Sequence, residues 1–187
     1  MGLSVTAYEN VDFDSYMDDN ELSDEQRDEC YDTMHLLSNG YEPLGQSDGI
    51  DTGFYNVGNY SKSFSGAYSG HKHFRSSLTN FLYEVDFGTE PGQFFEFILD
   101  EDGDVKRGYK KSPFIELFLF SDCEGFIGPK TSAKLHEDFV SYGVEFKEYL
   151  ENSEKYIGHA KDMYLEKYNN WLEAFQVASN NGFVDFH

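Results

Sequence analysis

The amino-acid sequence predicts an α+β fold, in which a small antiparallel sheet packs against helices and the chain ends in an antiparallel two-helix hairpin. Three observations predict it. Segments typical of strands lie near the two ends of the chain, at Leu3–Val11 and Phe183–His187. Residues 129–180 carry two apolar stripes with helical spacing, divided by a break at Asn152-Ser153. Turns rich in glycine and asparagine separate the segments between them.

The size and composition of the chain fit one globular domain, and we expect residues 1–187 to form it. A chain of 187 residues can bury a sizeable core without disulfides or metals. Hydrophobic residues make up only 39% of the chain, but each of its 18 Phe and 14 Tyr buries a large area. We find no internal repeat that would indicate a different architecture.

An acidic block follows the first expected strand. The stretch Glu9–Asp32 holds eleven acidic residues and one base, Arg27. Residues 9–38 are therefore expected to form a solvated acidic loop or a short helix. In the helical alternative, Ser23–Gln26 caps a helix that runs through Thr33–Leu37.

The middle of the chain predicts strands and helices joined by tight turns. Phe54–Val57 and Ser61–Ser65 predict a β-hairpin about a Gly-Asn turn. A helix is expected over about His71–Glu84, because its apolar residues share one face. Phe94–Leu99 is a strand or a short helix, and periodicity does not choose between them. Phe114–Phe120 is expected to be a central buried element.

The last third predicts two amphipathic helices. The first opens at Gly128-Pro129, since proline is well tolerated in the first turn. Its stripe recurs at spacings of 4, 3, 4 and 3 residues, at Leu135, Phe139, Tyr142, Phe146 and Tyr149. The second stripe comprises Ile157, Ala160, Tyr164, Tyr168, Trp171, Phe175 and Ala178. The short loop between them requires antiparallel packing, and Asn181-Gly182 ends the second helix before a terminal strand.

The charge of the chain limits its partners. A net charge of -21 repels nucleic acid and anionic membranes, so we expect neither as a direct partner. The charge is also uneven: residues 1–100 hold 19 acids and 4 bases, whereas residues 101–187 hold 16 acids and 10 bases. The few bases of the first part are therefore informative.

The cysteines and the first residues predict a cytoplasmic protein. Cys30 and Cys123 do not make a disulfide framework. The first ten residues lack the basic and apolar regions of a signal peptide. The longest apolar run, Phe114–Phe120, is too short to span a bilayer. No pattern in the sequence predicts a metal centre or a cofactor.

The first candidate site is YSKSFSGAYSGHKHFR at residues 60–75. It contains three of the four bases of the first hundred residues, and its candidate ligand-binding residues are Lys62, Tyr68, His71, Lys72 and Arg75. The segment leads into a helix N-terminus, where unpaired amide groups attract phosphate or carboxylate. Tyrosine can stack on a base. The alternative is an ordinary turn in which the bases offset local acids.

The second candidate is GPKTSAK at residues 128–134. The first turns of a long helix are expected to carry Lys130, Thr131 and Ser132, and this pattern predicts an anion site there. The order of glycine, lysine and hydroxyl residues differs from that of a Walker A loop. Ordinary helix capping explains the same residues equally well.

The third candidate is SDCEG at residues 121–125. A thiol with a histidine can make a nucleophile, but the adjacent acids Asp122 and Glu124 disfavour a thiolate at Cys123. One cysteine is also a poor basis for a structural zinc site. We therefore interpret Asp122 and Glu124 as residues that hold the loop or accept hydrogen bonds from a ligand, and we assign no catalytic residue.

Three long passages, together with the opening MGLSVTAYENV, carry a resemblance. They are YSGHKHFR at 68–75, FSDCEGFIGPKTSAKLHEDF at 120–139 and WLEAFQVASNNGFVDFH at 171–187. On these motifs the chain resembles a widespread family of small bacterial and phage proteins without an established activity. The resemblance implies no catalytic residues. It implies that Tyr68–Arg75, Ser121–Gly125 and Gly128–Leu135 belong to one recurrent pattern, and that a chain encoded by a phage acts in the host cytoplasm.

These observations predict three alternative functions. The first is a non-enzymatic protein that captures a phosphorylated or nucleotide-like ligand, which for a phage protein would be a signal of host defence. The second is an acidic inhibitor that occupies a basic, nucleic-acid-binding surface of a host protein, because carboxylates can imitate phosphates. The third is a hydrolase that uses the loop at 121–125.

Overall fold

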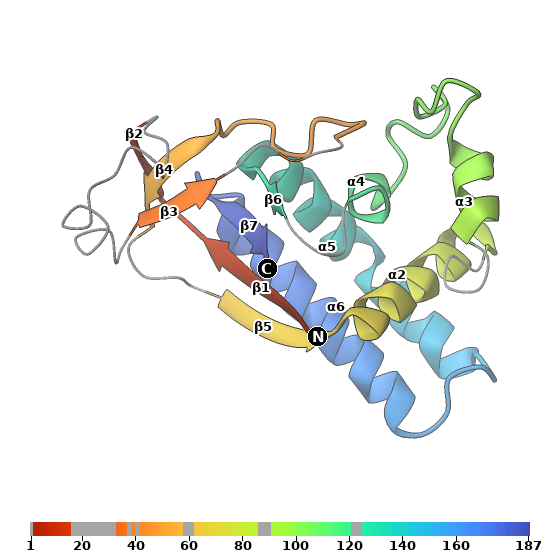
Figure 1. The fold of residues 1–187 in the computed structure, drawn as a ribbon. Coiled ribbons are helices and arrows are strands. Elements are labelled where there is room, and N and C mark those ends of the chain that lie inside the picture. The colour runs from red at the N-terminus through yellow and green to blue at the C-terminus, as the bar shows by residue number, and fades with distance from the viewer. Residues whose placement is uncertain are drawn as a thin grey trace.

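The computed structural model describes residues 2–15, 33–36, 39, 42–57, 62–85, 91–120 and 125–187, and it confirms the α+β fold (Figure 1). A larger antiparallel sheet has the strand order β5-β1-β7-β6, and a smaller one has the order β2-β4-β3. The strands are β1 (Gly2–Tyr8), β2 (Asp12–Ser15), β3 (Thr33–Leu36), β4 (Gly53–Asn56), β5 (Lys62–Ala67), β6 (Gly125–Ile127) and β7 (Phe183–Phe186). The helices are α2 (Tyr68–Tyr83), α3 (Pro91–Ile98), α4 (Ile115–Phe118), α5 (Pro129–Asn152) and α6 (His159–Ala178).

The two ends of the chain lie side by side in the middle of the larger sheet. Strand β7 confirms the predicted terminal strand, and it pairs with β1 so that Phe186 lies opposite Val5. Alternate residues of β1, namely Leu3, Val5 and Ala7, are buried in the core that helix α6 helps to form. Burial of each large apolar side chain contributes about 1.5–3 kcal/mol, so this sheet and α6 stabilise one another.

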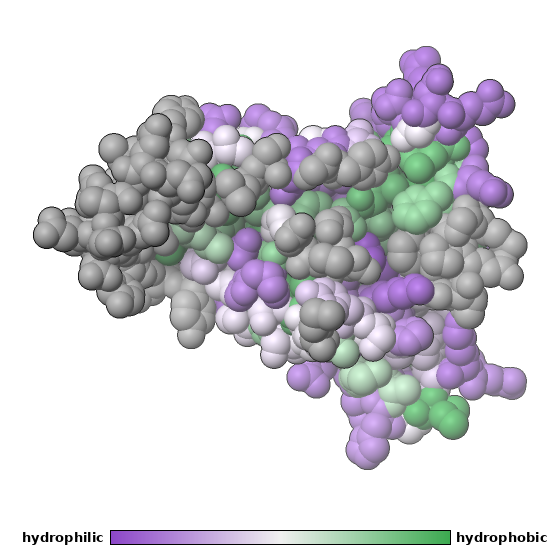
Figure 2. Space-filling model, in the orientation of Figure 1, coloured by the Kyte–Doolittle hydropathy of each residue, from purple (hydrophilic) through white to green (hydrophobic). Residues whose placement is uncertain are grey.

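The C-terminal helical hairpin is confirmed, with α5 and α6 packed antiparallel (Figure 1). Phe139 and Phe146 of the first stripe are fully buried, and the Tyr168 hydroxyl of α6 donates a hydrogen bond of 2.6 Å to the Phe139 carbonyl oxygen of α5. Ile157 was expected in the second stripe but is 76% exposed. It precedes α6, in the turn that reverses the chain, so helical spacing does not apply to it. Figure 2 shows an apolar spot at this end of the hairpin.

The predicted β-hairpin at 54–65 is wrong, although both strands exist. Strand β4 pairs with β2 and β3, whereas β5 pairs with β1 in the other sheet. Long-range packing overrides the local turn signal here, because Phe64 of β5 lies opposite Val5 and packs edge-on against Trp171, with ring centroids 5.0 Å apart.

The helical alternative at Thr33–Leu37 is also wrong, because residues 33–36 form strand β3. Leu36 is buried in a small apolar cluster with Tyr55 of the neighbouring strand, and Met34 packs against the same cluster. This spacing of two residues suits a strand. The proposed cap at Ser23–Gln26 lies outside the described residues.

The remaining helices refine the predictions. Helix α2 starts at Tyr68, earlier than expected, directly after β5. Helix α3 occupies the segment that periodicity left open between strand and helix. The predicted central element, Phe114–Phe120, is buried throughout and contains α4. None of the described helices combines the length and the apolar character needed to cross a membrane.

Candidate functional site

The first candidate site lies where strand β5 runs directly into helix α2. Ala67 is the N-cap of α2, and no side chain makes a capping hydrogen bond there. The first turn contains no acidic residue, although the chain has 35 of them. The N–H groups of a first helical turn have no partner within the helix and carry partial positive charge. This end of α2 is therefore suited to an anion.

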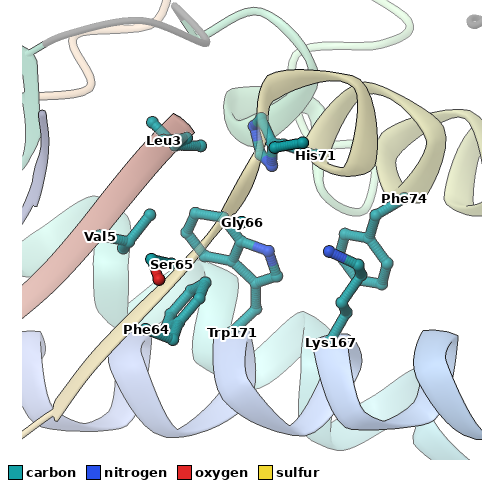
Figure 3. Close-up of a pocket in the computed structure, with 10 residues that line it drawn as sticks. Leu3, Val5, Phe64, Ser65, Gly66, His71, Phe74, Lys167 and Trp171 are labelled. Atoms are coloured by element: carbon teal, nitrogen blue, oxygen red, sulfur yellow. The ribbon is translucent and has the colours of Figure 1, made fainter. Parts of the chain in front are cut away.

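A small pocket opens beside this turn, between β1, β5, α2 and α6 (Figure 3). Its volume is about 20 Å³, which suffices for one or two water-sized groups. Its apolar walls include Leu3 of β1, Phe64 of β5 and Trp171 of α6. His71, Lys167 and the indole of Trp171 contribute the side-chain nitrogens of the described lining (Figure 3). The pocket thus combines a non-polar wall with a few nitrogen donors.

Lys167 extends from α6 toward the first turn of α2. Its Nζ lies 3.2 Å from the position that a Cβ would take on Gly70, and 3.6 Å from the corresponding position on Gly66. Glycine at these two places leaves room for the ammonium group. Lys167 forms no hydrogen bond or ion pair with the described part of the chain. A cation beside a helix N-terminus is electrostatically unfavourable, and an anion placed between the two converts that repulsion into two attractions.

His71 lies one turn into α2 and is only 5% exposed. Within the described residues, neither its Nδ1 nor its Nε2 has a hydrogen-bond partner. Burial, followed by the charges of Arg75 and Lys167, lowers the pKa of the imidazole well below its ordinary value of 6.5. The ring is therefore neutral at pH 7 and can donate one hydrogen bond.

Two of the predicted cations already interact with other parts of the protein. Lys62 is ion-paired with Glu173 of α6. Arg75 is 4% exposed, and its guanidinium donates a hydrogen bond of 2.9 Å to the carbonyl oxygen of Phe120. This bond brings α2 next to the residue that precedes the third candidate segment. Neither cation lines the pocket.

The other predicted residues of this segment are half-buried on α2, with Tyr68 packed against the core and Lys72 in the first two turns. The residue that sequence reasoning missed is Lys167, and with it the wall formed by Trp171. A signal existed: the two residues are four positions apart, so they share the face of α6 on which the predicted apolar stripe lies.

The second candidate segment is held by the chain itself. Lys130 pairs with Asp48 at 2.9 Å, and the amides of Gly128 and Lys130 donate to the carbonyl oxygens of Gln46 and Asp48 at 2.8 and 3.3 Å. The hydroxyls of Thr131 and Ser132 donate to the carbonyl oxygens of Gly45 and Ile127, each at 3.5 Å. These contacts are capping and packing, which the sequence allowed as the alternative.

Residues 121–124 of the third candidate segment fall outside the described residues, whereas Gly125 begins strand β6. Asp122, Cys123 and Glu124 are thus among the residues outside, and so is Cys30. The flanking residue Phe120 is buried and accepts the hydrogen bond from Arg75. In the part of the chain that the structure describes, no group of three or more His, Cys, Asp or Glu side chains is arranged to hold a metal ion.

A separate polar cluster lies on strand β7. Asp185 is 7% exposed, and its Oδ2 has no hydrogen-bond partner among the described residues. This oxygen lies 3.8 Å from Nε2 of His187, which in turn lies 3.2 Å from Oγ1 of Thr6. Burial raises the pKa of Asp185 to about 6, against the opposing effect of His187. Titration of Asp185 therefore makes the stability of the fold depend on pH.

No protein-family model, curated protein or solved structure matches the chain. Membership of the bacterial and phage family stays a prediction from the motifs.

Proposed function

We propose that the chain binds a small anionic ligand, whose terminal phosphate or similar oxyanion is held between Lys167 and the first turn of α2. The observation that carries this proposal is the Lys167 ammonium beside the positive end of a helix, without a carboxylate in that turn and without an ion-pair partner in the described chain. The proposal keeps the phosphorylated or nucleotide-like ligand that the sequence predicts. It replaces Lys62 and Arg75 by Lys167 as the residue that binds the charge.

The size of the pocket limits what enters it. A volume of about 20 Å³ admits one or two oxygen atoms of an oxyanion and no ring system. The remainder of a nucleotide-like ligand would therefore lie outside, along the exposed Ser65-Gly66 backbone. For a chain encoded by a phage, capture of this kind would sequester a phosphorylated signal of host defence.

The expected affinity follows from few contacts. Hydrogen bonds to charged groups contribute about 1.5–3 kcal/mol each, and a helix N-terminus adds about 0.3–1 kcal/mol. Lost translational and rotational freedom opposes them by at least about 4 kcal/mol. Inorganic phosphate alone is thus expected to bind with a Kd in the millimolar range, which corresponds to a binding free energy of about −4 kcal/mol. Repulsion by the distant carboxylates is largely screened beyond about 8 Å at physiological salt.

Isothermal titration calorimetry at about 0.15 M salt tests the proposal. We expect heat of binding with inorganic phosphate, pyrophosphate or a nucleoside phosphate, and at least a roughly tenfold weaker affinity for Lys167→Met, the equivalent of about 1.4 kcal/mol. Lys147→Met is the matched control, because it removes the same charge from an exposed position of α5, 4.0 Å from Glu151. Absence of heat with every phosphate ligand, or equal affinities of the Lys167→Met and control chains, would contradict the proposal.

A second function, the acidic inhibitor, is favoured by a different pocket. This open pocket of about 350 Å³ is lined by Asp12, Asp51, Tyr55 and Asn181 among others, and no Lys, Arg or His occurs in its described lining. Such a surface suits a lysine or arginine of a basic protein. The test is retention of a basic host protein that weakens as salt rises and is lost in the double variant Asp12→Asn, Asp51→Asn. Retention that the double variant leaves unchanged would exclude this surface.

A further inference from the structure

His71 is the buried polar side chain of the α2 pocket. Both of its ring nitrogens lack a partner among the residues that the structure describes, and the ring lies against Trp171 and Phe186, with centroid distances of 5.2 and 6.3 Å. Buried polar groups are normally hydrogen-bonded, and an unpaired one costs about 1–3 kcal/mol. An imidazole left in this state at the wall of a cavity points to a ligand that completes its hydrogen bonds.

The charged groups around His71 decide whether it carries a proton. Among the described residues they are Arg75, on the same helix, and Lys167, on α6. The residues that face it from β1 and β7, Leu3 and Phe186, are apolar. Without a ligand, burial and the two cations together keep the pKa of the ring low. An anion beside Lys167 offsets both cations and accepts hydrogen bonds from an imidazolium, and each effect favours the protonated ring.

We infer that His71 takes up a proton when a small oxyanion enters the pocket, so that the site binds the oxyanion and one proton together. The oxyanion is sulfate, phosphate or the oxyanion end of a larger molecule. This inference rests on the proposed function and adds its regulation by pH. Affinity rises as pH falls, by up to roughly tenfold per pH unit between the pKa values of the empty and the occupied site. A ligand bound in mildly acidic conditions is then released as the pH rises.

Sulfate is the appropriate probe, because it keeps its charge over the range in which histidine titrates, about pH 5–8. Calorimetry in two buffers with different heats of ionisation measures the protons taken up per sulfate. We expect uptake approaching one proton, together with an affinity that rises toward acidic pH. His71→Asn should abolish both effects. His73→Asn, at an exposed position of the same helix, should keep both and is the matched control.

Two outcomes separate this inference from the proposed function. Sulfate that binds with the same heat in both buffers and with an affinity independent of pH overturns the inference and leaves the anion site in place. Absence of binding by sulfate and phosphate alike overturns both. Since position 71 belongs to the core, the wild-type ring is also followed by NMR: its resonances should move to those of an imidazolium on saturation with sulfate. A ring that stays neutral in the saturated complex contradicts proton uptake.

Discussion

The Nζ atom of Lys167 lies 3.2 Å from the point that a Cβ on Gly70 would occupy. A lysine of α6 and a glycine of α2 therefore share one small space at the mouth of the pocket. A side chain at position 70 would compete with the ammonium for that space, and this makes the position of Lys167 testable without changing its charge.

Gly70→Ala is expected to weaken phosphate binding severalfold, because the new methyl group displaces the flexible end of Lys167. The same change should stabilise the fold by about 0.5–1 kcal/mol, since alanine is favoured over glycine within a helix. Calorimetry and urea denaturation measure the two effects. Gly143→Ala is the matched control: its Cβ would lie 3.6 Å from the Tyr168 ring, an ordinary contact, so it should leave the affinity unchanged. A Gly70→Ala chain that binds phosphate as the wild type does would argue against this placement of Lys167.

Lys134→Met is expected to destabilise the fold by about 2–4 kcal/mol at pH 7, because it leaves two carboxylates without their shared cation. Nζ of Lys134 lies 2.5 Å from Glu116 and 2.8 Å from Asp138, and both acids are mostly buried. Burial raises the pKa of Glu116 even with the lysine present. Acidification protonates this carboxylate and removes its need for a cation, so the difference in unfolding free energy between the variant and the wild type should become smaller. Urea denaturation at several pH values measures this. A loss no larger than that of the exposed Lys147→Met would contradict the role of this ion pair.

Asp185 is expected to make the fold less stable as the pH rises from about 4 to above 6. The pKa of its carboxyl group in the fold, about 6, lies above its ordinary value of 3.8, so the folded chain holds a proton that the unfolded chain releases. The contribution is fully present below the ordinary pKa and is lost as the pH passes the raised one. It amounts to at most about 3 kcal/mol.

The variant Asp185→Asn removes this titration. Its free energy of unfolding should therefore fall less than that of the wild type over the same pH range, as measured by urea denaturation. Glu148→Gln, at an exposed position of α5, should retain the wild-type dependence. If the free energy of unfolding changed with pH in the same way for the Asp185→Asn chain and the wild type, Asp185 would be excluded as the source of the pH dependence.

The elements that could be predicted are those whose signal is local. Phe139 and Phe146 mark the buried face of α5 by their spacing, and the turn at Asn181-Gly182 separates α6 from β7 as expected. Pairing between strands depends on distant partners. Phe64 lies opposite Val5 because Trp171 of α6 completes their packing, and no turn signal encodes that.

In the candidate site, too, features with a local sequence signal could be predicted, whereas features that depend on distant partners could not. The helix N-terminus at 68–70 and His71 could be found from sequence, because glycine, histidine and the end of a strand mark them. The two anion candidates looked alike in sequence, but only the structure shows that a Cβ on Gly128 would collide with the Ser47 carbonyl oxygen. The loop at residues 45–48 thus packs closely against the start of α5, and its carbonyl oxygens accept hydrogen bonds from the amides of Gly128 and Lys130. Lys167 was missed because its direction depends on how α6 packs against β5.

The backbone amides of Tyr68, Ser69 and Gly70 test the central claim most directly. In an NMR titration with inorganic phosphate, their resonances should shift progressively to saturation. The resonances of the Lys130 and Thr131 amides at the start of α5 should not shift, since the amide of Lys130 already donates a hydrogen bond to the carbonyl oxygen of Asp48. Shifts confined to α5, or unmoved α2 amides at phosphate concentrations well above the millimolar range, would contradict an anion site between Lys167 and α2.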